Sequence, residues 1–197
     1  MTPFTTLTSI AVPLIRDNID TDAIIPSREM KTVGKTGLAD GLFAGWRYTE
    51  VGGRAPEPGF VLNDPAYAGA AILLGGANFG CGSSREHAAW ALAEYGFRAV
   101  IAPSFNPIFR GNCVRNGIVP VELDAGAFAD APQPLTIDLS AQTIADADGK
   151  LAAFAIDAEA KAMLIGGLDA IDLTMRRAPR IAAFREADAV RRPWAYP

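Results

Sequence analysis

This chain of 197 residues contains little histidine and little cysteine. His87 is its only histidine, and its two cysteines, Cys81 and Cys113, are too few for the disulfide framework of a small secreted protein. A zinc site of the Cys and His type normally takes four such ligands, and an iron–sulfur cluster normally takes three or four thiolates. The composition therefore predicts that this chain binds no metal or cluster by itself, and that any metal chemistry comes from a partner.

Long apolar runs and basic blocks are missing as well. The most apolar segment, 68–77, is far shorter than the about 20 residues that cross a bilayer, and the N-terminus lacks a basic region followed by an apolar run. Basic residues number 18 against 22 acidic ones, and the basic clusters are two arginine pairs, at 176–177 and 191–192. Nucleic acid and membranes are therefore not expected as partners. We expect a cytoplasmic protein with a single domain over 1–197.

The stretch 78–88 (NFGCGSSREHA) leads from a glycine-rich turn into a predicted helix. Ser83 and Glu86 have the spacing of a capping box, which places the start of the helix near Ser83. The free N–H groups of a helix N-terminus favour a carboxylate or phosphate, and Arg85 can hold a carboxylate through two hydrogen bonds. An ordinary capped helix is the alternative interpretation, but the glycines and serines around it favour a pocket for a small anion.

Several better-known motifs begin in this stretch and are not completed. Cys81 stands where a P-loop requires lysine, and Arg85 stands at the third glycine of a dinucleotide fingerprint. Neither serine lies in Gly-x-Ser-x-Gly, and no aspartate is in evidence to orient His87, which argues against a serine hydrolase. The three aspartates within 17–22 lack the glycine and glutamate of a calcium loop. Cys81 is best interpreted as a small turn residue, because no general base is in sight.

Apolar patterns and capping residues predict alternating strands and helices. The predicted strands lie at 9–15, 60–63, 71–74, 99–102, from 119, and at 135–139, 142–147 and 151–156. The predicted helices lie at 88–95, 106–117, 158–165 and 179–189. This order favours an α/β fold in which at least two helices cover one face of a small sheet.

Two segments are predicted to lie outside this framework. Residues 27–46 carry four glycines and three basic side chains, a composition that favours a mobile loop over a packed element. The tail at about 190–197 contains proline and is predicted to be peripheral.

Three segments, in this order and spacing, resemble the aconitase swivel domain: 20–26 (DTDAIIP), 80–88 (GCGSSREHA) and 104–109 (SFNPIF). The size and the residues at 35–37 (KTG), 42–43 (LF) and 46–47 (WR) narrow the resemblance to the small subunits of 3-isopropylmalate dehydratases. The resemblance covers about 7–184. It implies a swivelling β/β/α three-layer domain.

The resemblance also implies a function and a partner. In that family a large subunit carries a 4Fe-4S cluster, and the small subunit closes over it to complete the active site. The substrate is a 2-alkylmalate such as 2-isopropylmalate in leucine biosynthesis, whose hydroxyl moves to the adjacent carbon by loss and re-addition of water. Iron would accept the departing hydroxide as a Lewis acid.

The motif match implies roles for individual residues. Ser83 would take the carbon-bound proton, and Arg85 would bind a substrate carboxylate. Because an unperturbed serine hydroxyl is a poor base near neutral pH, the closed site must be dry and strongly polarised. The other candidates are Asp22, Lys35, Thr36 and Ser84 toward the substrate, and Gly82, Glu86 and His87 in support.

Two departures from the family pattern concern the choice of substrate. The family commonly has arginine where this chain has Lys35, and a lysine neutralises a carboxylate without forking to it. Residues 27–30 (SREM) replace the more usual aromatic or aliphatic residues. On the sequence alone, dimethylmalate, methylmalate and homoaconitate dehydratases stay open as alternatives, as does a non-catalytic module that binds anions.

Overall fold

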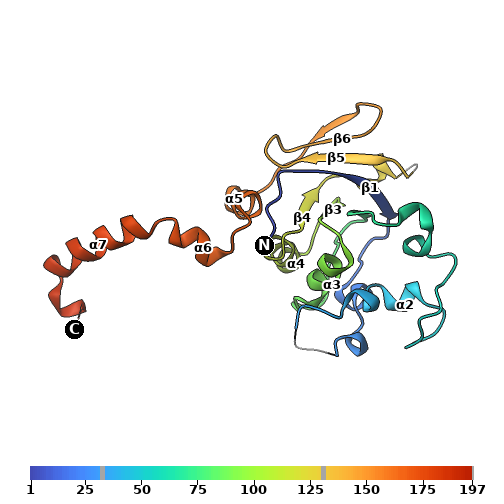
Figure 1. Cartoon of the computed structure of the whole chain (residues 1–197), viewed down its shortest axis with the longest axis horizontal. Coiled ribbons are helices and arrows are strands. Elements are labelled where there is room, and N and C mark those ends of the chain that lie inside the picture. Colours follow the sequence, from blue (N-terminus) through green and yellow to red (C-terminus); the bar gives the residue numbers. More distant parts are fainter. Residues whose placement is uncertain (32–33, 130–131, 197) are drawn as a thin grey trace.

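The architecture is built on one curled sheet. The structure is a computed structural model that describes residues 1–31, 34–129 and 132–196. Within these ranges, seven strands follow the order β4-β3-β2-β1-β5-β6-β7 (Figure 1). Their bounds are β1 Thr6–Leu14, β2 Ile72–Gly75, β3 Ala99–Ala102, β4 Val119–Glu122, β5 Pro134–Asp138, β6 Thr143–Ala145 and β7 Leu151–Ala153.

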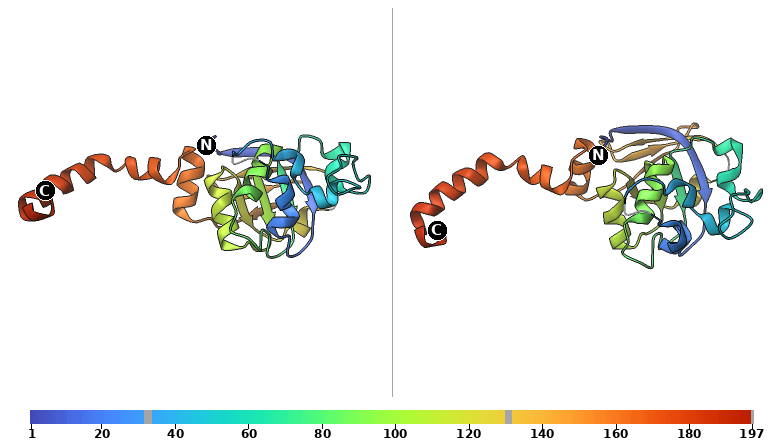
Figure 2. Two further views of the ribbon diagram at one scale, coloured as in Figure 1. Left: turned by 90° about the horizontal axis from the view of Figure 1, so that it is seen from below. Right: turned by 60° about the horizontal axis from the view of Figure 1, so that its bottom comes forward.

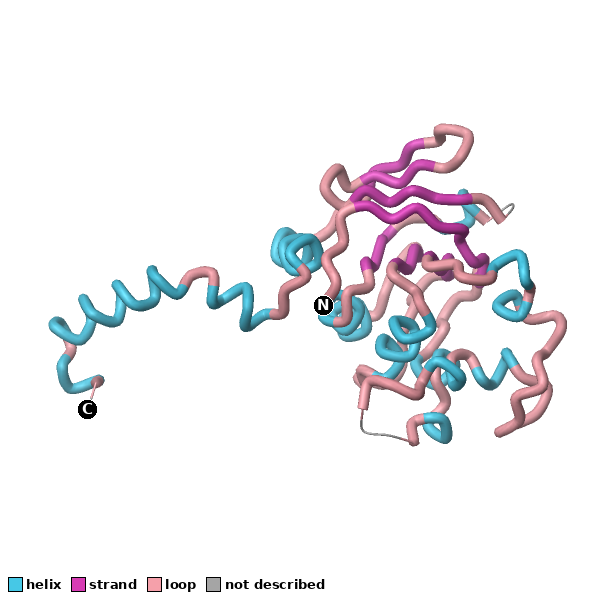
Figure 3. The backbone as a smooth tube through the Cα atoms, in the orientation of Figure 1, coloured by secondary structure: helices cyan, strands magenta, loops and turns pink. Residues whose placement is uncertain are grey.

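Strand β1 joins a parallel half to an antiparallel half. It pairs in parallel with β2 through Ala11 and Ile72, and antiparallel with β5 through Leu7 and Ile137. Strands β3 and β4 continue the parallel half, and β6 and β7 continue the antiparallel half. Figure 3 shows the antiparallel strands curling over the parallel ones. Strands β2 and β3 are buried at every residue, which explains why they read as continuous apolar runs.

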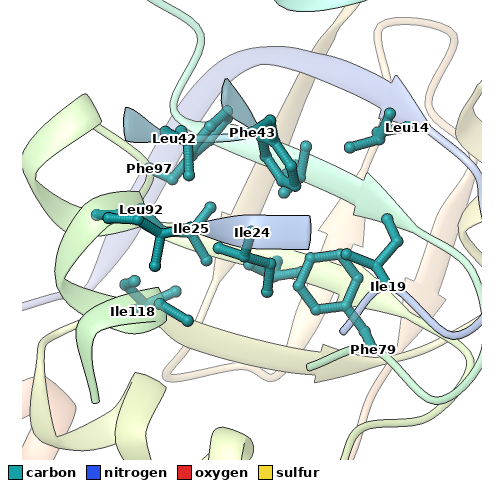
Figure 4. Close-up of a cluster of buried hydrophobic side chains, with 14 of the residues drawn as sticks. Leu14, Ile19, Ile24, Ile25, Leu42, Phe43, Phe79, Leu92, Phe97 and Ile118 are labelled. Carbon is teal, nitrogen blue, oxygen red and sulfur yellow. The ribbon is translucent and has the colours of Figure 1, made fainter. Parts of the chain in front are cut away.

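Two hydrophobic clusters divide the fold into three layers. Successive residues of β2 point to opposite faces, so Leu73 joins one cluster and Leu74 the other. The first cluster joins the parallel strands to helix α3 (His87–Tyr95) through Leu92, and Figure 4 shows part of it. The second joins the parallel strands to Leu135 and Ile137 of the antiparallel half. The layers are therefore antiparallel strands, parallel strands and helices, as the β/β/α prediction requires.

The helices begin and end largely where capping residues predict. The Asn106 side chain accepts hydrogen bonds from the backbone amides of Ile108 and Phe109, and Pro107 follows at the first helical position. Gly96 ends α3 with a φ of 118°. The α-helices are α1 Thr21–Ile24, α2 Ala44–Arg47, α3, α4 Pro107–Arg115, α5 Ala158–Gly166, α6 Ala170–Met175 and α7 Ala178–Arg191. The 3₁₀ helices are η1 Ser27–Glu29, η2 Ala39–Gly41, η3 Val61–Asn63, η4 Pro65–Tyr67, η5 Ala125–Phe128 and η6 Pro193–Ala195.

The predicted strand at 60–63 is wrong, because this segment forms η3. Phe60 and Leu62 are buried and Val61 is half-buried, an alternation that a half-buried strand would also give. The turn is closed by Asn63, whose backbone amide donates to the Phe60 carbonyl at 2.8 Å. Its side-chain amide donates to the Arg47 carbonyl at 2.7 Å. The contact with Arg47 reaches outside the segment, so the local pattern could not reveal it.

The prediction that 27–46 is an unpacked loop is wrong for its second half. Leu38, Leu42 and Phe43 are fully buried, and Phe43 donates its backbone amide to the Ile24 carbonyl at 2.7 Å. A Cβ added at Gly41 would lie 2.6 Å from the Cβ of Glu29. The glycine therefore permits close packing here. Residues 32–33 lie outside the described residues, and the mobility of the exposed part stays a prediction.

The C-terminal segment forms an arm that leaves the body of the fold. Helices α6 and α7 and η6 extend away from the sheet in all views (Figures 1 and 2). The peripheral segment therefore begins near 170, about 20 residues earlier than predicted, and α6 was not predicted at all. In the part of the chain that the structure describes, no helix combines the length and apolarity needed to cross a membrane.

Candidate functional site

Backbone hydrogen bonds join the segment that follows β1 to the segment that follows β2. Gly80 donates its amide to the Ile19 carbonyl at 2.7 Å, and Thr21 donates its amide to the Cys81 carbonyl at 2.9 Å. The buried hydroxyl of Thr21 accepts a hydrogen bond from the Ser83 amide at 3.0 Å. The first and second motifs of the sequence therefore meet at the carboxyl ends of neighbouring parallel strands, where open α/β sheets commonly bind ligands.

The segment after β3 completes this arrangement. Phe79 donates its amide to the Ser104 carbonyl at 3.0 Å and accepts the Asn106 amide at its own carbonyl at 3.0 Å. Its ring packs against Phe105 and Phe109, with centroids 6.1 and 5.6 Å away. All three sequence motifs thus converge at one edge of the sheet, although Thr21 and Ser83 of the first two motifs are already 62 residues apart along the chain.

The predicted capping box of Ser83 and Glu86 is wrong. Helix α3 begins at His87, and in the described chain no side chain caps its N-terminus. The Ser83 hydroxyl accepts the Arg85 amide at 3.3 Å, while the Glu86 carboxylate accepts the side-chain amide of Asn116 at 2.8 Å. The local pattern misled because both groups have tertiary partners. The Ser83 amide donates to the Thr21 hydroxyl, and Asn116, which follows α4, binds the Glu86 carboxylate. Ser83 therefore lies in an irregular segment ahead of the helix.

Three of the predicted site residues share one small hollow. Asp22, Arg85 and His87 line it together with Thr21, and the space between them is too small to admit a water molecule. The Asp22 and Arg85 side chains are exposed, so they are free to meet a ligand. The apolar residues Ile25, Met30 and Ala88 complete the lining. The structure therefore brings a guanidinium and a carboxylate to one place beside Ser83, which is bound to Thr21.

His87, at the start of α3, is half-buried in the lining of this hollow. Its ring centroid lies 4.7 Å from that of Trp90, one turn further along α3. Its Nδ1 atom is buried and finds no hydrogen-bond partner in the ranges that the structure describes. Gly82 and Ser84 are exposed between Cys81 and Arg85, and the Ser84 carbonyl accepts the Asn112 side chain at 3.4 Å.

The structure does not bring Lys35 and Thr36 into the lining of the hollow. Both are exposed. The Lys35 ammonium donates to the side-chain oxygen of Asn116 at 3.2 Å and lies 5.4 Å from the centroid of the Trp90 ring. Lys35 is therefore held against Trp90 of α3 and against Asn116, which follows α4.

Polar residues of α3 and α4 support the site and were missed by the sequence analysis. Asn112 is 2% exposed, and Arg115 donates to its side-chain oxygen. The Nε atom of Arg115 lies 3.6 Å from the Glu86 carboxylate, which Asn116 also binds. The available signal was the spacing of Asn112 in α4 and Asn116 at its C-terminal cap, because side chains four residues apart lie on the same side of a helix.

The two cysteines lie in different surroundings. Cys113 is fully buried, and desolvation raises the pKa of its thiol well above its usual range, so it stays protonated. Cys81 is half-buried, and its backbone pairs with Asp20 and Thr21. Across the described residues, His, Cys, Asp and Glu side chains do not gather into a group of three or more that could hold a metal ion.

The chain is similar to known proteins over its whole length. The family described as "Aconitase C-terminal domain" matches residues 1–126. The 3-isopropylmalate dehydratase small subunit of Cupriavidus necator is 53% identical over 205 residues, which cover 100% of this chain and 99% of that protein. The 3-isopropylmalate dehydratase small subunit of Paramagnetospirillum magneticum is 48% identical, with 98% and 100% covered.

A solved structure agrees with these sequence matches. The crystal structure of 3-isopropylmalate dehydratase (leuD) from Methanocaldococcus jannaschii matches with a TM-score of 0.70 and 27% sequence identity. The match covers 90% of this chain and 99% of that one.

Proposed function

This chain belongs to the aconitase C-terminal domain family and, within it, to the 3-isopropylmalate dehydratase small subunits, and from this membership we propose that Ser83 and Arg85 provide its half of an active site. The function is that of a hydro-lyase subunit, which interconverts 2-isopropylmalate and 3-isopropylmalate by dehydration and rehydration. The chain acts together with a large subunit, and the reaction belongs to leucine biosynthesis.

The convergence of the three motifs carries this proposal. Backbone hydrogen bonds of 2.7 to 3.0 Å fix the segments around Thr21, Gly80 and Asn106 against one another. They set Arg85 and Asp22 around one hollow, with Ser83 attached to its wall through Thr21. A site that is this strongly fixed by its backbone is preorganised for a small anionic substrate.

The roles follow from the chemistry of the side chains. The Arg85 guanidinium binds a substrate carboxylate through two parallel hydrogen bonds, with Asp22 and Ser84 as further polar groups. The Ser83 oxygen accepts the proton that leaves the substrate carbon. An ordinary serine hydroxyl is a poor base, and both Ser84 and Arg85 are exposed in this chain. Covering by the large subunit therefore supplies the dry, polarised surroundings that the proton transfer needs.

The iron–sulfur cluster of this enzyme class belongs on the large subunit in this proposal. The described part of the chain offers no gathering of metal ligands, and Cys113 is fully buried and protonated. These residues do not fit a 4Fe-4S cluster, so this chain contributes side chains that bind substrate and move a proton.

Anaerobic mixing with the large subunit tests this function. We expect that the purified chain alone does not turn over 2-isopropylmalate, and that adding the large subunit restores turnover because each subunit supplies half of the site. Dimethylmalate, methylmalate and homoaconitate serve as comparison substrates. We expect 2-isopropylmalate to give the highest kcat/KM of the four. Turnover by the chain alone would contradict the proposal, and preference for another alkylmalate would move the function to a related dehydratase.

A further inference from the structure

The backbone just after Lys35 and Thr36 is held by a carboxylate from α3. Glu94 accepts hydrogen bonds from three successive backbone amides, those of Gly37 at 2.6 Å, Leu38 at 2.5 Å and Ala39 at 2.9 Å. One carboxylate oxygen takes the first amide and the other takes the remaining two. Successive amides that point to one anion form a strong binding concavity, and here the anion is a side chain of the same protein.

The three hydrogen bonds compensate for the unfavourable position of the Glu94 carboxylate in its helix. Glu94 lies in the last turn of α3, where the helix dipole disfavours a negative charge. Desolvation raises the pKa of Glu94, but the three amide hydrogen bonds together lower it below its usual range. Leu38, between the other two donors, is fully buried, so the held backbone is also tied to the core.

A second contact holds the Lys35 side chain itself. The Asn116 side-chain oxygen accepts from the Lys35 ammonium at 3.2 Å, and its nitrogen donates to the Glu86 carboxylate at 2.8 Å. Lysine only donates and a carboxylate only accepts, so one orientation of the Asn116 amide satisfies both partners. Asn116 therefore links a cation at 35 directly to the motif that carries Ser83 and Arg85.

We propose that Glu94 and Asn116 are positioning residues that fix Lys35 beside Arg85 as the second cation for a dicarboxylate substrate. This inference rests on the proposed function, because an alkylmalate carries two carboxylates and Arg85 matches one. Trp90 lies between the hollow and Lys35. The centroid of its ring is 4.7 Å from the centroid of the His87 ring and 5.4 Å from the Lys35 ammonium. Glu94 and Asn116 touch neither carboxylate and act through Lys35.

A double-mutant cycle with the complete enzyme tests the role of Asn116. In the mixture with the large subunit, Lys35→Ala and Asn116→Leu are each expected to raise the KM for 2-isopropylmalate about tenfold, with kcat little changed. The double variant is expected to show no further rise in KM, because in this proposal Asn116 affects substrate binding through Lys35. Effects that multiply in the double variant, or a loss confined to kcat, would overturn the proposal.

Glu94→Gln tests the other contact, with a readout that does not depend on turnover. Hydrogen exchange of the amides at 37–39 in the purified chain is expected to become about tenfold faster, and KM in the mixture is expected to rise in parallel. Glu57→Gln is the matched control, because Glu57 accepts the Gly59 amide at 3.3 Å in a different loop. Unchanged exchange would overturn the Glu94 contact. Absence of turnover by the unmodified mixture would instead contradict the proposed function, with the exchange result still valid.

Discussion

Gly80 illustrates at the residue scale how the site depends on backbone freedom. Its φ is 76°, and an added Cβ would collide with the ring and Cβ of Phe109. Gly80 therefore meets two requirements that glycine alone satisfies together, a left-handed backbone and close approach of α4. The glycine-rich turn was recognised from the sequence, but the contact with Phe109 depends on how the segments after β2 and β3 meet.

Gly80→Ala is expected to destabilise the protein by about 3 kcal/mol or more, because backbone strain and the collision with Phe109 add up. Gly69→Ala is the matched control, since Gly69 has a φ of 75° and no atom within 4 Å of an added Cβ. The control is expected to lose about 1 kcal/mol from backbone strain alone. Urea unfolding of both variants measures the difference, and equal losses would contradict the packing described here.

Glu94 gives a prediction about pH. Its folded-state pKa lies below the ordinary value of 4.5, since three amide donors outweigh desolvation. The carboxylate therefore stabilises the fold above that pH, and the contribution is lost as the pH falls through the folded-state pKa. We expect the amide resonances of Gly37, Leu38 and Ala39 to titrate together below pH 4.5. In the Glu94→Gln variant this titration should vanish. If the three resonances of the unmodified protein titrate with a midpoint above pH 4.5, the hydrogen bonds to Glu94 are contradicted.

Residue-level predictions succeeded where the partner is close in the sequence. Asn106 caps α4 through amides two and three residues away, and this cap was predicted. Ser83 and Glu86 failed as a cap because Thr21 and Asn116 bind them from distant segments. The same limit hid Asn112 and Glu94, whose partners belong to other elements.

At the element scale, the parallel strands were predicted well because both of their faces are covered. Strands β2 and β3 appear as short apolar runs between turn residues, which is a strong signal. The packing of 38–44 was missed because the four glycines of 27–46 suggested mobility, whereas Gly41 allows the chain to pack on Glu29. Composition describes local freedom and does not show which segment will cover a hydrophobic core.

Helix α7 makes little contact with the rest of the protein. Apart from Ala178, Asp188 and Ala189, its residues are exposed. Asp188 is covered from within the arm, since it accepts hydrogen bonds from Arg192 and Tyr196. These contacts close a short C-terminal turn and do not reach the sheet.

Removing residues 178–197 is therefore expected to leave the stability of the remaining chain unchanged within about 0.5 kcal/mol. The measurement is the midpoint and slope of urea unfolding, with the full chain as the control. A loss of more than about 1 kcal/mol would show that α7 packs on the body in solution.

At the scale of the whole molecule, the fold presents the proposed half of an active site at one edge of a three-layer domain. The parallel strands end where three loops converge, and Arg85 and Asp22 face outward there around a small hollow. The strand pattern predicted an α/β sheet covered by helices on one face, and the three-layer architecture and the large-subunit partner were predicted from the resemblance to the aconitase swivel domain. The positions of Lys35 and Asn116 were not, because they depend on how helices α3 and α4 pack.

The turnover of Ser83→Ala with the large subunit tests the central claim most directly. If Ser83 accepts the substrate proton, kcat for 2-isopropylmalate is expected to fall by about 100-fold or more while binding to the large subunit is retained. Ser140→Ala, at an exposed serine of the antiparallel half, is the matched control and should keep full activity. Full activity of Ser83→Ala in the same mixture would contradict the account and favour a non-catalytic role for this chain.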